Sequence, residues 1–146
     1  MNRRFRLAAV LRARKAQENA AKGAVRAART AEQAAIERRQ AREAALVAQP
    51  TLNGAPAPWF VAAMSARQAM AAEVSAMARY AEQLADVTEE KTAELTEAAV
   101  RRRSVEALEV RHEAAVTAED QAAEQRAVDE IAGRRPPYGR NGEEAP

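Results

Sequence analysis

The sequence predicts an all-α protein: an antiparallel two-helix coiled coil, or helical hairpin, whose second helix is longer than the first. Three observations support this fold. Aromatic residues make up only 3% of the 146 residues, whereas alanine contributes 40, so there is too little bulk for a wide globular core. Proline is absent from 1–49 and from 59–135, which permits long helices. Apolar and small residues recur at alternating spacings of three and four, the heptad pattern of coiled coils.

The first helix is expected over residues 5–48. One heptad series runs through it, and we take this series as the seam that faces the second helix. Its members are Val10, Ala13, Gln17, Ala20, Ala24, Ala27, Ala31, Ala34, Arg38, Ala41, Ala45 and Ala48. Because this series is nearly all alanine, it predicts a close approach of the two backbones.

A hinge is expected at 49–57, where the stretch "QPTLNGAPAP" places prolines and Asn-Gly within ten residues. Such residues favour turns and interrupt helices. Pro58 suits the first turn of the next helix, where its missing N–H costs nothing. Trp59 and Phe60 follow directly and are expected to cover the last layer of the hairpin.

The second helix is expected over 58–132, within a single coiled-coil domain of residues 1–133, and residues 134–146 are expected to be a disordered tail. Its heptad series carries larger side chains than the first. The members are Phe60, Ala63, Arg67, Met70, Val74, Met77, Ala81, Leu84, Thr88, Lys91, Leu95, Ala98, Arg102 and Val105. The lengths predict that residue 5 lies near residue 100, so that about thirty residues of the second helix extend beyond the first.

Charge is distributed unevenly along the chain. Residues 1–48 carry 12 Lys and Arg against 4 Asp and Glu, whereas residues 49–146 carry 11 against 17. A basic first helix can therefore pair with an acidic second helix. A nucleic-acid arm would be the other use of the basic opening, but no nucleic-acid-binding motif or aromatic stacking pattern accompanies it. We therefore expect no nucleic-acid partner.

The residues of catalytic and metal sites are missing. There is no cysteine, His112 is the only histidine, and the five glycines stand singly, so neither a metal site nor a phosphate-binding loop is assembled. We expect no enzyme activity and no cofactor. The apolar run "LAAVL" is too short for a secretory signal, and no run is long enough to span a membrane. Coiled coils without catalytic or metal-binding residues act by holding or bridging their partners or by transmitting motion between them.

The two ends of the chain resemble the flagellar export protein FliJ family. The opening "FRLAAVLRARKAQENAA" is similar to the start of that family, through Phe5, Leu7, Val10, Leu11 and Arg14. The far end, "RRRSVEALEVRHEAAVTAEDQAAEQRAVDEIAGRR", is similar to its C-terminal signature, which closes on Glu124, Gln125, Arg126, Asp129, Glu130, Ile131 and Ala132. The middle of the chain, about 20–100, matches only as an alanine-rich coil.

The resemblance implies a cytoplasmic rod, peripheral at the inner face of the cell membrane, that resembles the central stalk of a rotary ATPase. Its implied partners are the hexameric export ATPase, the membrane export-gate protein and export chaperones. The implied ATPase contacts are Phe5, Leu7, Val10, Leu11, Arg12, Arg14, Arg126, Val128, Asp129, Glu130 and Ile131. The implied gate contacts are Trp59, Phe60, Met64 and Met70. The alternatives are a generic coiled-coil adaptor, a stalk of virulence type III secretion and a basic nucleic-acid-binding coil.

Overall fold

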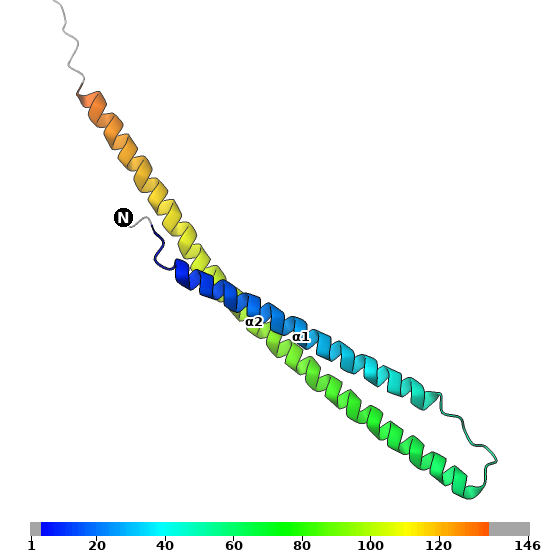
Figure 1. Ribbon diagram of the computed structural model, residues 1–146. Helices are drawn as coiled ribbons and strands as arrows, with labels where there is room; N and C mark the ends of the chain where they lie inside the picture. The colour runs from blue at the N-terminus through cyan, green and yellow to red at the C-terminus, as the bar shows by residue number, and fades with distance from the viewer. Residues whose placement is uncertain (1–3, 135–146) are drawn as a thin grey trace, which may run out of the picture.

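The computed structural model describes residues 4–134, which form two helices and a connecting loop. Helix α1 spans Ala8–Val47 and helix α2 spans Ala57–Gly133. Figure 1 shows α1 lying along α2, with the end of α2 continuing well beyond it. The all-α hairpin with a longer second helix is thereby confirmed. The expected bounds of 5–48 and 58–132 differ from the observed ones by one to three residues, and most of the expected tail, residues 135–146, lies outside the described residues.

Helix α1 begins without the usual local signals. Leu7 makes no side-chain cap, and the first turn contains no acidic residue, although a carboxylate there would favour the positive end of the helix dipole. Instead, the backbone N–H of Ala8 bonds to the carbonyl of Phe5 at 3.2 Å, and Leu11 is buried. The start of α1 is therefore held by contacts with α2 and by alanine-rich helix propensity.

The hinge contains one position that glycine suits. Gly54 has φ of +83°, a left-handed conformation that side chains with a Cβ disfavour. The N–H of Ala55 bonds to the carbonyl of Leu52 at 3.4 Å, which closes a turn around Asn53 and Gly54. Helix α2 then starts after Pro56, with Pro58 in its first turn, where the missing N–H has no partner to lose.

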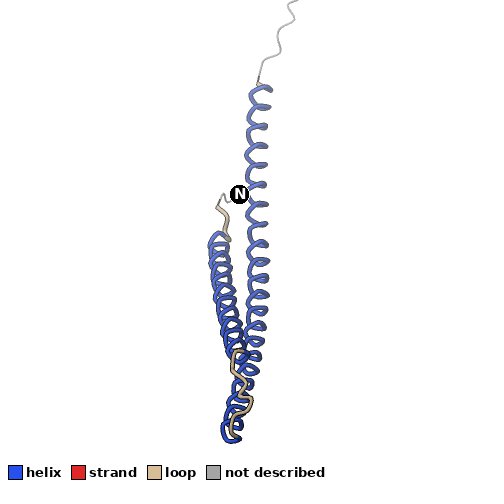
Figure 2. Tube along the Cα trace, turned by 90° about the vertical axis from the view of Figure 1, so that its right-hand side faces the viewer, coloured by secondary structure: helices blue, strands red, loops and turns tan. Residues whose placement is uncertain are grey.

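The two helices are offset more than the sequence predicted. Phe5 packs against His112, with ring centroids 5.7 Å apart, so the expectation that residue 5 lies near residue 100 was wrong. At the other end, Gln49 contacts the sulfur of Met70 at 2.9 Å. The hinge loop therefore does not turn tightly but continues beyond the end of α1, alongside the first turns of α2, before the chain reverses (Figure 2). We define residues 113–134, the part of α2 beyond His112, as the overhang; it is shorter than the thirty residues expected.

The seam of α2 was predicted correctly. The predicted series from Ala63 to Val105 is buried or half-buried at every member, and it continues through Glu109, His112 and Val116. Phe60, the first predicted member, is the exception, because it is 49% exposed beside the loop.

The seam of α1 was predicted one residue out of phase. Leu11, Glu18, Val25 and Ala35 are buried, whereas the predicted positions Val10 and Ala13 are exposed. The observed seam is Ala8, Leu11, Arg14, Glu18, Ala21, Val25, Ala28, Glu32, Ala35, Arg39, Arg42 and Leu46. The nearly all-alanine seam was therefore wrong, and the true one contains five charged residues.

The core is thin as a consequence. Among residues 4–134, the buried apolar side chains are those of Leu11, Val25, Ala35 and Ala81. Ion pairs add to this limited burial. The Arg42 Nε of α1 donates to the Glu73 carboxylate of α2 at 2.6 Å, which is the pairing of a basic first helix with an acidic second helix that the charge distribution indicated.

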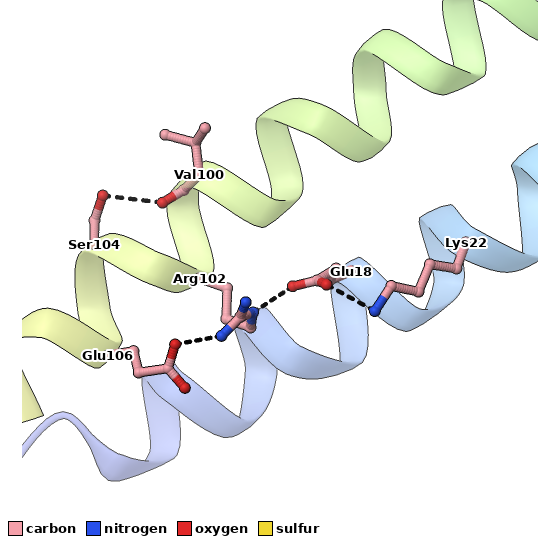
Figure 3. A network of polar contacts seen from close by, with 6 residues as sticks. All are labelled: Glu18, Lys22, Val100, Arg102, Ser104 and Glu106. Carbon is pink, nitrogen blue, oxygen red and sulfur yellow. Dashed lines mark hydrogen bonds and ion pairs between the residues drawn. The ribbon is translucent and has the colours of Figure 1, made fainter.

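A second ion pair between the helices has the opposite polarity and lies deeper. The Glu18 carboxylate of α1 binds the Arg102 guanidinium of α2, and it also accepts from Lys22 Nζ at 2.8 Å. Arg102 in turn binds Glu106 on its own helix (Figure 3). Lys22, followed by Arg102, holds the pKa of the Glu18 carboxyl below its ordinary value of 4.5. A buried carboxylate is tolerated here because both cations satisfy it.

The offset can be tested by cross-linking. Cysteines at Phe5 and His112 should form a disulfide within one chain under mild oxidation, because these side chains are in contact. Cysteines at Phe5 and Ala98 test the predicted offset, in which residue 5 lies near residue 100. This pair should remain mostly reduced, because Ala98 lies about 21 Å from His112 along α2. Faster oxidation of the second pair, measured by mass spectrometry after proteolysis, would contradict the observed offset.

The Glu18 cluster predicts a pH dependence of stability. The pKa of Glu18 is lower in the folded chain than in the unfolded chain, so its stabilisation is present above about pH 4.5 and is lost as the pH falls through the folded value. Glu18→Gln should therefore lower the Tm at pH 7 and change it little at pH 3. The control is Glu97→Gln, whose ion pair with Arg101 is exposed and should contribute little. An equal loss of Tm for Glu18→Gln at both pH values would contradict this role.

Candidate functional site

The predicted site residues of this chain lie in three places: around the N-terminus of α1, in the overhang and at the hinge. The N-terminal group lies beside His112 of α2. Leu7 and Val10 are 39% and 40% exposed, whereas Leu11 is only 4% exposed and packs in the seam. Phe5 is half-buried on His112. The apolar residues predicted as one contact surface are therefore divided: Leu7 and Val10 face outward, and Leu11 holds α1 on α2.

The two arginines predicted beside them also differ. Arg12 is exposed, whereas Arg14 is a half-buried seam residue whose Nη1 donates to Gln17 at 2.9 Å. A partner meeting this end would reach Arg12 directly. It would reach Arg14 only at the edge of the interface between the helices.

The overhang is the second end, and it continues α2 past Phe5 and His112 (Figure 1). Residues 117–134 are exposed at every position, so no face of this stretch is covered by α1. Val128 and Ile131 are 58% and 73% exposed. Large apolar side chains with this exposure at the end of a helix are typical of a contact surface.

The polar residues predicted in the overhang contact only their own helix. Gln125 donates to Asp129 at 3.1 Å, Arg126 Nε donates to the carbonyl of Ala122, and Arg134 binds Glu130 at 2.6 Å. These contacts are four residues apart, as helical geometry requires. They are weak at an exposed surface, so the side chains can exchange them for a partner.

The structure does not bring the two ends into contact, but it orders them along one axis. Phe5 lies level with His112, and Ile131 follows nineteen residues later, about 28 Å further along the helix. A partner that binds both ends must therefore have depth along the rod.

The hinge end carries the third group of predicted residues. Trp59 is 68% exposed, Phe60 and Met64 are also exposed, and Met70 is half-buried against Gln49. Phe60 and Met64 border a hollow between α2 and the hinge loop. The covering of the last layer expected of Trp59 and Phe60 is not observed, because the loop lies over α2 and leaves both rings facing solvent.

Sequence reasoning missed two residues at this end. Leu52 in the loop borders the same hollow, and Val61 on α2 is exposed next to Phe60. Their proximity to Trp59 in the chain was a signal that could have identified them. With these residues the hinge end is an exposed apolar patch, which we call the hinge patch: Leu52, Trp59, Phe60, Val61 and Met64.

Two further observations limit the chemistry of the described residues. No group of three or more His, Asp or Glu side chains within residues 4–134 is arranged to hold a metal ion. In the same part of the chain, neither helix is apolar enough over a sufficient length to cross a membrane.

Comparison with known proteins identifies the family to which this chain belongs. Searches of curated proteins and of solved structures gave no match. The model of the family described as flagellar FliJ protein matches residues 3–141, which is nearly the whole chain. The chain belongs to the flagellar FliJ protein family, whose members are non-enzymatic components of the flagellar export apparatus.

Proposed function

We propose that this protein is the stalk of the flagellar export apparatus, a cytoplasmic rod that joins the export ATPase hexamer to the membrane export gate. The observation that carries this proposal is the overhang, a long stretch of helix that α1 leaves uncovered from residue 117 onward. A helix exposed on all sides is marginal in water. Such a helix gains most stability from a partner that surrounds it, as the bore of a ring does.

The ATPase ring would bind both ends at different depths. Val128 and Ile131 would lie inside the bore, together with Arg126, Asp129 and Glu130. Leu7, Val10 and Arg12 would meet the rim, since they face outward at the level of His112. Phe5 and Leu11 would support this surface from within, and Arg14 would contribute at its edge.

The hinge patch would bind the export gate. It lies at the opposite end of the rod from the overhang (Figure 1), so one molecule can reach both partners without competition. Trp59, Phe60 and Met64 supply exposed apolar area there, and aromatic and methionine side chains are enriched in protein interfaces. Met70 is covered by Gln49 and would become accessible if the loop moved. Export chaperones would be additional partners of the body.

The overhang can be tested through the ATPase. Stimulation of the cognate ATPase by added rod should fall at least about tenfold for Val128→Asp combined with Ile131→Asp, because buried apolar contacts are replaced by charge. The control is Val100→Asp, since Val100 is 55% exposed, close to the 58% of Val128, but lies on the paired part of α2. Removal of residues 121–146 should have the same effect as the double substitution.

Three results would contradict the role of the overhang. The intact rod could fail to stimulate the ATPase at micromolar concentration, the double variant could stimulate it as well as the wild type, or Val100→Asp could be equally impaired. Circular dichroism on each variant separates a lost contact from lost folding, because these side chains are exposed and contribute little to the hairpin.

The hinge patch can be tested by binding to the cytoplasmic domain of the gate protein. Trp59→Ala combined with Met64→Ala should weaken binding by about 2–4 kcal/mol, the range for exposed aromatic anchors at an interface. ATPase stimulation should be unchanged. Loss of both activities in a folded variant would contradict the assignment of separate partners to the two ends.

A further inference from the structure

The outer surface of α1 carries a set of five cations. Arg12, Lys15, Lys22, Arg26 and Arg29 occupy one side of the helix, since their spacings of three, four and seven place them on neighbouring turns. We call this surface the basic flank. Lys22 pairs with Glu18, whereas within the described chain Arg26 and Arg29 form no ion pair.

The basic flank borders an open groove between the helices. Three cations, Lys22, Arg26 and Arg29, line it on the α1 side, and Val25 and Leu95 lie at its floor. The other α1 residues that line it are Thr30, Gln33, Ala34 and one carboxylate, Glu37. On α2, Leu95 borders the groove, and Ala85, Thr92 and Ala99 in the same part of the helix are small and half-buried. A groove with an apolar floor and a rim of three cations and one carboxylate fits a helix that has an apolar stripe and acidic edges.

The overhang has this chemistry. Residues 113–134 contain six carboxylates and two arginines. Val116, Ala123, Ala127 and Ile131 share one face of the helix, at spacings of seven, four and four. Glu124 lies beside this face on one side, and Glu119 and Glu130 lie beside it on the other. Asp120 lies within the face, between Val116 and Ala123. The overhang is therefore an acidic helix with a narrow apolar stripe that Asp120 interrupts, and within its own chain α1 leaves it uncovered from residue 117 onward.

The lengths of the two surfaces also agree. The overhang is about 33 Å long, and the stretch of α1 from Arg12 to Arg29 is about 26 Å long. They cannot meet within one chain, because the overhang points away from α1 (Figure 1). A two-fold axis crossing the rod at about residue 110 of α2 would bring each overhang onto the basic flank of the other copy, since the flank lies on one side of that level and the overhang on the other.

We propose that the basic flank of α1 binds the overhang of a second copy, so that two rods associate as a symmetric antiparallel dimer. Ala123, Ala127 and Ile131 of each overhang cover the floor of the other copy's groove, and the carboxylates beside them meet Arg26 and Arg29. This association does not rest on the proposed function. Its consequence for that function is that the dimer covers Ile131, so a rod in the dimer cannot also place its overhang in an ATPase ring.

Analytical ultracentrifugation of the full chain over a range of concentrations tests this proposal. The wild type should show a monomer–dimer equilibrium that weakens as salt rises, because charges contribute to the interface. Arg26→Glu combined with Arg29→Glu should raise the dimer Kd by about tenfold or more, since close charge pairs across an interface are strongly coupled. Adding Glu124→Arg and Glu130→Arg to that chain should restore the dimer.

Two control variants make the test specific. Arg79→Glu combined with Arg103→Glu changes the net charge equally at exposed positions on α2 and should leave the Kd within about twofold, as expected for charges outside an interface. Trp59→Ala combined with Phe60→Ala removes apolar area from the hinge patch and should also leave the dimer Kd unchanged. A wild type that stays monomeric at every concentration, a control that weakens the dimer as much as the flank variant, or a charge-restored chain that stays monomeric would overturn the proposal.

Discussion

The small amount of apolar area that two helices can bury against each other is the constraint on which the rest of this structure depends. Each helix of a two-stranded coiled coil covers only one stripe of its partner. In this chain much of that stripe is alanine, and few apolar side chains are buried along the rod. Alanine supports the helix itself through its propensity, but it adds little to the attraction between helices. Individual contacts such as those of Leu11, Val25 and the Glu18 cluster therefore contribute an unusually large share of the stability with which α1 packs on α2.

The same constraint explains why the hinge does not determine the offset of the helices. The nine residues between Val47 and Ala57 could extend to about 30 Å, and they cover a distance of about 20 Å along α2. A loop with this slack permits more than one heptad register. The observed register must come from side chains: it joins Glu18 to Arg102, Arg42 to Glu73 and Phe5 to His112. Charged seam residues weaken a coiled coil but specify how its helices align.

The small apolar area between the helices also determines how much of this fold could be predicted from the sequence. The fold class, the hinge and the seam of α2 were predictable, because methionine, leucine and valine mark one phase of α2 clearly. The phase of α1 was not, because alanines at neighbouring positions fit two heptad series equally well. Leu11, Val25 and Leu46 belong to the observed series and only Val10 to the predicted one, so weighting large side chains above alanine would have selected the right phase. The offset could not be predicted, since it depends on pairs of charged residues far apart in the chain.

The division of the candidate site follows from the phase of α1. Six apolar and basic residues near the N-terminus looked equivalent in the sequence, but a shift of one residue buries Leu11 and exposes Val10. The exposure of the overhang was predictable from helix lengths alone, because no segment of the first helix could reach it. A rod with so thin a core exposes large apolar side chains along its length, at Val47, Tyr80, Val100 and Val110 as well as in the overhang. The hinge patch differs because it brings five of them together at one end of the rod. The hairpin itself gains little from such a group of exposed side chains, so their presence there is better explained by a partner than by folding.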